Sequence, residues 1–79
     1  MAFFVYLLEC SDGSYYCGFT PDLEKRIKAH DFGKASKYTR ARLPAKLVFS
    51  EILETKSLAL KREAQIKKLS RKEKEKLLK

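Results

Sequence analysis

Two tyrosines, an arginine–histidine pair and a late glutamate are the residues of this 79-residue chain whose types and spacing could support chemistry. Tyr6 and Tyr16 lie in aromatic-rich segments, Arg26 and His30 are four residues apart, and Glu63 stands among apolar residues. Phenol and imidazole groups donate and accept protons, and a guanidinium binds oxyanions in a forked geometry. Each residue also has an ordinary structural explanation, so the fold must decide whether they meet.

The segments that carry the two tyrosines are predicted to form a β-hairpin. Residues 3–9 (FFVYLLE) and 14–19 (SYYCGF) are rich in aromatic and β-branched residues, as strands are. Residues 10–13 (CSDG) form the turn between them, and residues 46–53 (KLVFSEIL) are predicted as a third strand.

The register of the hairpin decides whether the tyrosines share a face. In a two-residue type I′ turn, Tyr6 faces Phe19, and Tyr6 and Tyr16 lie on opposite faces. In a three-residue loop with Gly13 in the left-handed conformation, Tyr6 faces Gly18 and both tyrosines share one face. Glycine inside a strand often marks the close approach of a ligand or another backbone, which favours the second register.

Three helices are predicted around these strands. Thr20 is the expected N-cap of the first helix, with Pro21 at its first position, and the helix runs to about Phe32 with Gly33 as its stop. A second helix covers about 56–69, and Ser70-Arg71-Lys72-Glu73 has the spacing of a capping box that opens a short terminal helix. The order β-β-α-β-α-α indicates a single small α+β domain over residues 1–79.

The helical candidates each have two interpretations. Arg26 and His30 are neighbours at the edge of an apolar stripe, either as a functional pair or as a surface arginine beside a half-buried ring. Glu63 falls inside the apolar arc of its helix, which is costly unless its charge is neutralised. The alternative is an edge glutamate paired with Arg62 or Lys67.

Charge points to a polyanionic partner. Eighteen Lys and Arg against ten Asp and Glu give a net charge of +8, and nucleic acid is the commonest partner of such proteins. The loop 33–46 holds no acidic residue, and its cations surround Tyr38, which fits phosphate contacts and stacking on an unpaired base. A solvated basic loop is the alternative. The terminal RKEKEKLLK is expected to be a solvated helix that docks Leu77 and Leu78.

The two cysteines and the apolar opening exclude several protein classes. Cys10 and Cys17 are too few for a disulfide scaffold or a metal cluster, and they lie on opposite faces in either register. Glu9 interrupts the apolar opening after a few residues, so we expect neither a signal peptide nor a membrane span. The expectation is a cytoplasmic protein with free thiols.

These features together resemble the GIY-YIG nuclease domain. The "GIY" motif corresponds to Phe4-Val5-Tyr6 and "YIG" to Tyr16-Cys17-Gly18, followed by LEKRIKAH at 23–30 and the late Glu63. The resemblance covers essentially the whole chain and is closest to small stand-alone bacterial members. It implies a three-stranded antiparallel sheet flanked by helices.

The resemblance also implies a role for each candidate. Tyr6 would be the general base that activates water, Tyr16 would orient water or phosphate, and Arg26 would stabilise charge on the phosphoryl group. His30 would be a hydrogen-bonding or proton-transfer partner, and Glu63 would hold a divalent metal, Mg²⁺ or Mn²⁺. Phosphodiester hydrolysis needs an activated water and positive charge near the developing anion. Nearby cations are expected to lower the Tyr6 pKa.

The sequence departs from the family pattern at Phe4 and Cys17. It also has no asparagine or second histidine, so the support that such a residue gives in several family members is either missing or supplied by Tyr38 or Thr39. The expected function is a metal-dependent endonuclease that recognises the structure or backbone of DNA, rather than RNA, in repair or recombination. A partner protein or a homodimer would supply targeting. The alternatives are a binding module without useful catalysis and a basic RNA-associated protein. The expected nucleic-acid contacts are Gly18, Lys34, Lys37, Tyr38, Thr39, Arg40 and Arg42.

Overall fold

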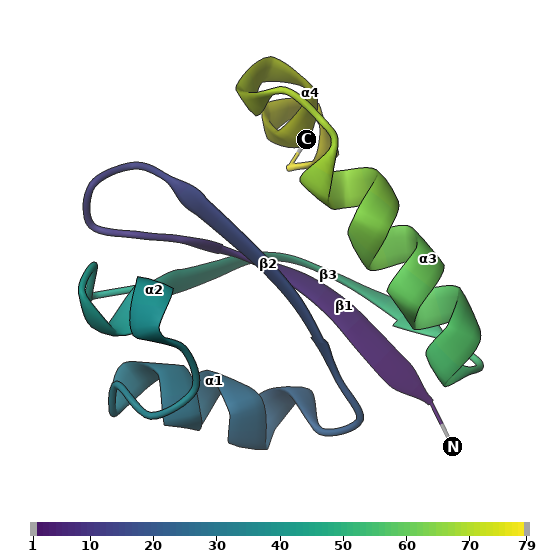
Figure 1. The fold of residues 1–79 in the computed structure, drawn as a ribbon, viewed down its shortest axis with the longest axis horizontal. Helices are drawn as coiled ribbons and strands as arrows, with labels where there is room; N and C mark the ends of the chain where they lie inside the picture. Colours follow the sequence, from purple (N-terminus) through teal and green to yellow (C-terminus); the bar gives the residue numbers. More distant parts are fainter. Residues whose placement is uncertain (1, 79) are drawn as a thin grey trace.

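A central antiparallel sheet with helices on both faces makes up residues 2–78, the part of the chain that the computed structural model describes (Figure 1). The strand order is β2-β1-β3, so β1 is the central strand. In chain order the elements are β1 (Phe3–Glu9), β2 (Tyr15–Thr20), α1 (Leu23–Asp31), α2 (Lys37–Arg40), β3 (Lys46–Leu53), α3 (Lys56–Lys67) and α4 (Arg71–Leu77). The predicted order is confirmed, with α2 as an additional helical turn inside the basic loop.

The hairpin adopts the three-residue loop. The Cys10 N–H donates to the Ser14 carbonyl at 2.8 Å, and the Gly13 N–H donates to the Cys10 carbonyl at 2.9 Å. Gly13 has φ +82°, the left-handed conformation that this loop requires and that glycine adopts without strain. Tyr6 therefore lies opposite Gly18, and both motif tyrosines share one face, as the favoured register predicted.

Strand alternation divides the core into two layers. On one face of the sheet, Val5 and Leu7 pack against α3. On the other face, Tyr6 and Leu8 pack with residues of α1 and the loop before β3. Figure 1 shows α1 and α2 on one side of the sheet and α3 and α4 on the other. The cysteines divide in the same way, since buried Cys10 and Cys17 belong to different layers and neither forms a disulfide.

The start of α1 differs from the prediction, and its end does not. Asp22, not Thr20, is the N-cap, and its carboxylate accepts the Lys25 N–H at 3.1 Å. Thr20 is wrong as the cap because it is still paired in β2, and its hydroxyl instead accepts the Asp22 N–H at 3.1 Å. At the other end Gly33, with φ +72°, donates to the His30 carbonyl at 2.9 Å and stops the helix.

The C-terminal helix begins with the predicted capping box. The Ser70 N–H donates to Glu73 Oε1 at 3.0 Å, and the Glu73 N–H donates to Ser70 Oγ at 3.2 Å. Leu77 packs against the α3 layer, whereas Leu78 is 37% exposed, so only the first of the two expected leucines docks. Within residues 2–78, no helix has the length and apolar character needed to cross a membrane.

Candidate active site

Tyr6 is a buried phenol that lies directly over Gly18. Its side chain belongs to the core on the α1 face, and the residue is only 2% exposed. A Cβ atom at position 18 would stand 2.6 Å from the Tyr6 Oη and 2.8 Å from its Cζ. The group that approaches Gly18 closely is therefore the Tyr6 ring, rather than the ligand or second backbone that a glycine in a strand suggested. Gly18 is buried and does not present a surface to nucleic acid.

A chain of hydrogen bonds connects Tyr6 to the turn before β3. The Tyr6 hydroxyl lies 2.9 Å from His30 Nε2, and His30 Nδ1 lies 2.8 Å from Thr39 Oγ1. The Thr39 hydroxyl donates to the Ser36 carbonyl at 3.3 Å, so it accepts from His30 Nδ1–H. This assigns the Nδ1–H tautomer to His30 and makes Nε2 the acceptor of the Tyr6 O–H proton.

Tyr16 stands beside this chain within an aromatic cluster. Its ring centroid lies 5.3 Å from that of His30 and 6.5 Å from that of Tyr6. On the far side Tyr16 stacks on Tyr38, with centroids 6.0 Å apart and planes inclined by 29°. The Arg42 guanidinium carbon lies 3.9 Å from the Tyr38 centroid. Tyr38 therefore already contacts two partners of this chain, which leaves less of its ring for the expected stacking on a base.

Burial controls the protonation of the two central groups. Desolvation raises the pKa of Tyr6, the neighbouring Tyr16 raises it further, and the positive charge of Arg26 opposes the rise without cancelling it. Arg26 therefore lowers the Tyr6 pKa as expected of a nearby cation, but the net shift is upward because burial outweighs it. Desolvation also lowers the pKa of His30, and Arg26 adds to that effect while Asp31 opposes it. Both groups are consequently neutral at neutral pH, which fits the assigned hydrogen bond.

Arg26 and Glu63 approach this cluster from opposite layers. Arg26 is partly buried on α1, and its charge acts on both Tyr6 and His30. Glu63 lies on α3 with a side chain 16% exposed, and it pairs with Lys67 at 3.8 Å, one of the two partners considered. The other, Arg62, pairs instead with Glu51 at 3.1 Å. The negative charge of Glu63 makes the smallest of the contributions that raise the Tyr6 pKa, after burial and the nearby Tyr16 and Cys17.

Glu63 is the side chain that could hold a metal. Over residues 2–78, no group of three or more His, Cys, Asp and Glu side chains is placed to bind one. A single partly buried carboxylate suits Mg²⁺, which keeps most of its waters when bound, and does not suit zinc, which needs more protein ligands. The donor set therefore fits the expected hard cation.

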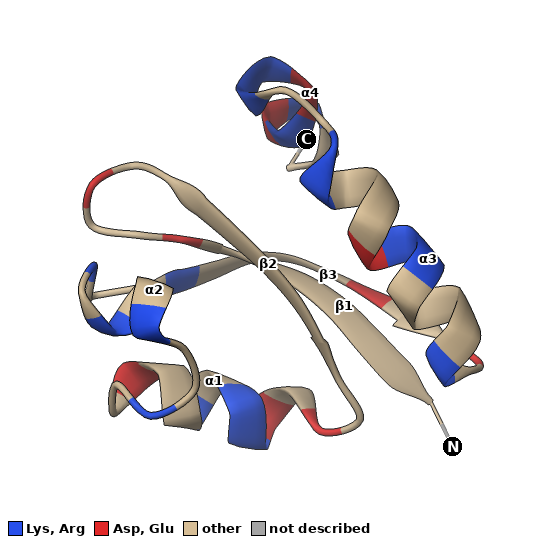
Figure 2. Ribbon diagram, in the orientation of Figure 1, with Lys and Arg blue, Asp and Glu red and all other residues tan. Residues whose placement is uncertain are grey.

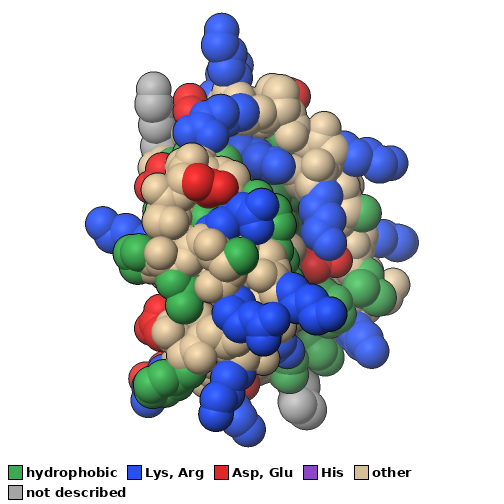
Figure 3. Space-filling model, turned by 60° about the vertical axis from the view of Figure 1, so that its left-hand side comes forward, with side chains coloured by type: hydrophobic (Ala, Val, Ile, Leu, Met, Phe, Trp, Pro, Cys, Tyr) green, Lys and Arg blue, Asp and Glu red, His purple; other side chains and the backbone are tan. Residues whose placement is uncertain are grey.

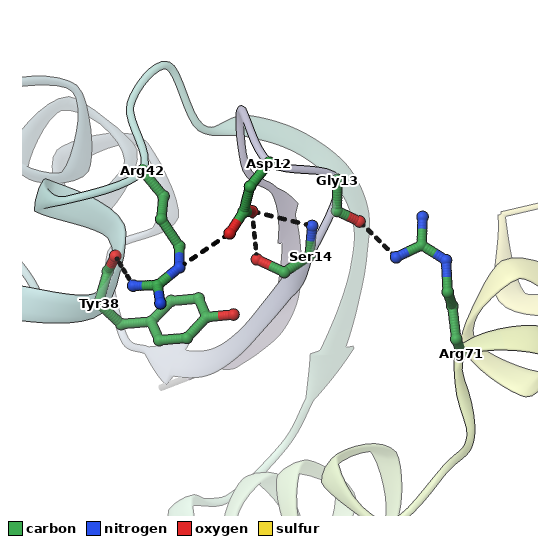
Figure 4. Close-up of polar contacts among 6 residues, drawn as sticks. All are labelled: Asp12, Gly13, Ser14, Tyr38, Arg42 and Arg71. Carbon is green, nitrogen blue, oxygen red and sulfur yellow. Dashed lines mark hydrogen bonds and ion pairs between the residues drawn. The ribbon is translucent and has the colours of Figure 1, made fainter.

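The expected nucleic-acid contacts separate into surface and interior residues. Lys34, Lys37 and Arg40 are exposed along the segment that contains α2. Basic side chains predominate on the face turned forward in Figure 3, where no histidine is visible, and Figure 2 places further Lys and Arg on α3 and α4. Thr39 is fully buried against His30, and Arg42 forms an ion pair with Asp12 at 3.0 Å (Figure 4). Thr39 is therefore placed to support the histidine rather than to meet nucleic acid.

Sequence reasoning missed the helical turn α2 and its contacts with the hairpin. Ser36 caps this turn, with its hydroxyl accepting the Tyr38 N–H at 3.2 Å. A serine ahead of Lys-Tyr-Thr-Arg is a signal for a helix start, and it could have indicated that Tyr38 and Thr39 are held in fixed positions. The partnership of Asp12 with Arg42 has no comparable signal because the two residues are 30 positions apart.

Comparison with known proteins places this arrangement in a family. The model of the GIY-YIG catalytic domain matches residues 2–76. A UPF0213 protein of Bacillus licheniformis is 52% identical over 75 residues, which cover 95% of this chain and 77% of the relative. The solution NMR structure of the UPF0213 protein BH0048 of Bacillus halodurans has a TM-score of 0.63 at 47% identity, and that of the protein EF2693 of E. faecalis has a TM-score of 0.67 at 43% identity. Each match covers 99% of this chain and 83% of the other. The hydrogen-bonded tyrosine, its histidine and the single carboxylate thus stand on a chain that belongs to the GIY-YIG nuclease family and is similar to its small UPF0213 proteins.

Proposed function

We propose that this protein is a metal-dependent endonuclease that hydrolyses phosphodiester bonds of DNA. The observation that supports this most directly is the buried chain from Tyr6 through His30 to Thr39, with Arg26 beside it. A buried tyrosine needs a hydrogen-bond partner, and here that partner is a titratable imidazole whose tautomer is fixed by a second buried hydroxyl. The membership in a nuclease family supports the same reaction class.

The hydrogen-bonded chain supports a proton relay at Tyr6. With its raised pKa, Tyr6 is a phenol at neutral pH and holds no preformed negative charge. It can act as a base toward water only if its own proton leaves as the water proton arrives. His30 Nε2 is 2.9 Å from the phenol oxygen and accepts in the assigned tautomer, so it can take that proton. Thr39 keeps the imidazole oriented during the transfer.

Positive charge is available for the phosphoryl oxygens. Arg26 can donate two parallel hydrogen bonds to non-bridging oxygens, and its charge stabilises the transition state more than the ground state. Tyr16, fixed between His30 and Tyr38, would orient the water or the phosphate. A divalent ion bound by Glu63, Mg²⁺ or Mn²⁺, would supply Lewis-acid stabilisation of the leaving oxygen.

The surface supports recognition of backbone or structure rather than sequence. Lys34, Lys37 and Arg40 offer phosphate contacts, which position a protein on DNA without reading bases. One active site cuts one strand, so cleavage of both strands would take a homodimer or two events, and a partner protein or second copy would supply targeting. Repair or recombination is the proposed setting, because branched and flapped DNA is recognised by its structure.

Cleavage of labelled substrates tests this proposal. Single-stranded, duplex, flap and branched DNA, and a matching RNA, would be incubated with Mg²⁺ or Mn²⁺ and then with EDTA. Wild type would be compared with Tyr6→Phe and Glu63→Gln. Tyr15→Phe is the matched control, because Tyr15 loses the same hydroxyl but packs against the opposite layer of the core.

Metal-dependent cuts that Tyr6→Phe and Glu63→Gln abolish and Tyr15→Phe preserves would support the proposal. Binding to every substrate with steep salt dependence but without cleavage would instead identify a nucleic-acid-binding module. Preference for RNA without a metal requirement would favour the RNA-associated alternative.

A further inference from the structure

Two arginines hold the hairpin turn from opposite sides. From the segment after α2, Arg42 Nε donates to Asp12 Oδ2 at 3.0 Å. From the start of α4, Arg71 Nη1 donates to the Gly13 carbonyl at 2.6 Å. Figure 4 shows both arginines reaching the turn, with Tyr38 beneath Arg42. The turn lies at the end of the hairpin and not in the core, so a clamp on each side needs an explanation.

The Arg42 side of the clamp leads directly to the candidate active site. Besides Asp12, the Arg42 guanidinium contacts the Tyr38 ring and donates from Nη1 to the Tyr38 carbonyl at 3.1 Å. The Ser11 N–H donates to the Arg42 carbonyl at 2.9 Å, so backbone and side chain both join this segment to the turn. Asp12 is itself fixed, because its Oδ1 accepts the Ser14 N–H at 3.0 Å and the Ser14 hydroxyl at 2.6 Å.

The element held by this clamp is α2, which supports two site residues at once. Tyr38 stacks on Tyr16, and the neighbouring Thr39 accepts from His30. A helix of four residues is not stable alone, since nucleation costs more than so few hydrogen bonds return. Its position must therefore come from its anchors. The Asp12–Arg42 ion pair is the side-chain anchor that joins the end of this segment to the hairpin turn, beside the Ser11–Arg42 backbone hydrogen bond and the stacking of Tyr38 on Tyr16.

We propose that Asp12 and Arg42 are positioning residues for catalysis, which hold α2 so that Tyr38 fixes Tyr16 and Thr39 fixes the tautomer of His30. This inference rests on the proposed nuclease function for its kinetic consequences, although its structural consequence is independent of activity. In this role Arg42 is held by Asp12 through Nε and by the Tyr38 carbonyl through Nη1, which differs from the phosphate contact that the sequence suggested. The arginine on the other side, Arg71, lies over Tyr15, which faces away from the site.

Three variants separate this role from others. Asp12→Asn and Arg42→Gln each break the ion pair, and Arg71→Gln is the control that releases the same turn from the side away from the site. Asp12→Asn is the most informative variant, because it removes a negative charge. Electrostatics alone would then strengthen binding to DNA, whereas lost positioning would slow the cleavage step.

The first readout is the state of His30, measured by long-range ¹H–¹⁵N NMR on the folded protein without DNA. We expect wild type and Arg71→Gln to show one tautomer with the proton on Nδ1, and Asp12→Asn and Arg42→Gln to show exchange between tautomers. A single unchanged Nδ1–H tautomer in both clamp variants would overturn the inference. The NMR measurement needs no cleavage of DNA, so it tests the positioning role even if the proposed nuclease function fails.

The second readout is single-turnover cleavage across a range of DNA concentrations. A loss of alignment should reduce the maximal rate constant about tenfold to a hundredfold with half-saturation changed by less than about twofold, because small displacements of positioned groups are costly. The exchanged pair, Asp12→Arg with Arg42→Asp, should recover part of that rate. A weaker half-saturation with an unchanged maximal rate would instead make Arg42 a DNA contact and overturn the positioning role.

Discussion

Replacing Gly18 with alanine should disturb the site at its most tightly packed point. The new Cβ would stand 2.6 Å from the Tyr6 Oη and 2.8 Å from its Cζ, closer than real contacts allow. A flexible surface side chain would move away at little cost. Tyr6 cannot, because it is 2% exposed and hydrogen-bonded to His30 at 2.9 Å. Either the phenol leaves the histidine or β2 moves away from β1.

The size of the effect follows from three contributions to the free energy of unfolding. Overpacking a filled core costs about 1–3 kcal/mol, and loss of the Tyr6–His30 hydrogen bond costs about 1 kcal/mol more. Alanine recovers roughly 0.5–1 kcal/mol because it has less backbone freedom to lose than glycine. The net destabilisation is about 1–3 kcal/mol, and at about 4–8 °C per kcal/mol for a domain of this size the melting temperature should fall by roughly 5–20 °C.

Thermal and urea unfolding followed by circular dichroism would measure this change, and cleavage by the folded variant would measure its effect on the site. Tyr6→Leu provides the cross-check, because removing the ring should make Gly18→Ala nearly harmless in the double variant. If Gly18→Ala had the melting temperature and the activity of wild type, the phenol of Tyr6 could not lie over residue 18. Equal losses with and without the Tyr6 ring would likewise refute the close contact as the cause.

Three further outcomes are expected. Glu63→Gln should reduce Mg²⁺-dependent cleavage at least about 100-fold without changing the melting temperature by more than a few degrees, as assayed across a metal titration. Burial lowers the His30 pKa in the folded protein, so the unfolded chain takes up that proton first, and the free energy of unfolding should fall as the pH drops below about 6.5. Urea unfolding of His30→Gln should lack this part of the fall. An identical pH dependence in wild type and variant would contradict the assignment of the shift to His30. Cleavage should decline in the same direction, since protonated His30 cannot accept from Tyr6. Lys37→Gln and Arg40→Gln should each reduce the slope of log affinity against log salt by about 1 on every DNA tested, measured by fluorescence anisotropy.

The hairpin and its register could be predicted because local rules determine them. Strand residues alternate, Gly13 permits the left-handed loop position, and Gly18 signalled close approach within a strand. The reason for that approach could not be predicted, because the group that comes close to Gly18 is the tyrosine directly opposite. A period-two pattern assigns a residue to a face of the sheet but does not say where a long side chain leans.

The protonation of the site was mispredicted for a related reason. Sequence shows which charges are near one another along a helix, and the cations expected near Tyr6, Arg26 among them, suggested a lowered pKa for its phenol. Sequence does not show how deeply a phenol is buried, and desolvation raises the Tyr6 pKa by more than the arginine lowers it. The consequence reaches the chemistry, since a phenol with a raised pKa needs a partner that removes its proton. If Tyr6 is the proposed base, His30 is necessary to that function rather than auxiliary to it. The orientation of His30 depends on Thr39, which the sequence offered both as a supporting residue and as a nucleic-acid contact. The loop that we propose to contact phosphates with its surface residues thus also orients the proposed proton acceptor with its buried residue Thr39. A substitution in this loop should therefore weaken DNA binding or catalysis according to which side of α2 it alters.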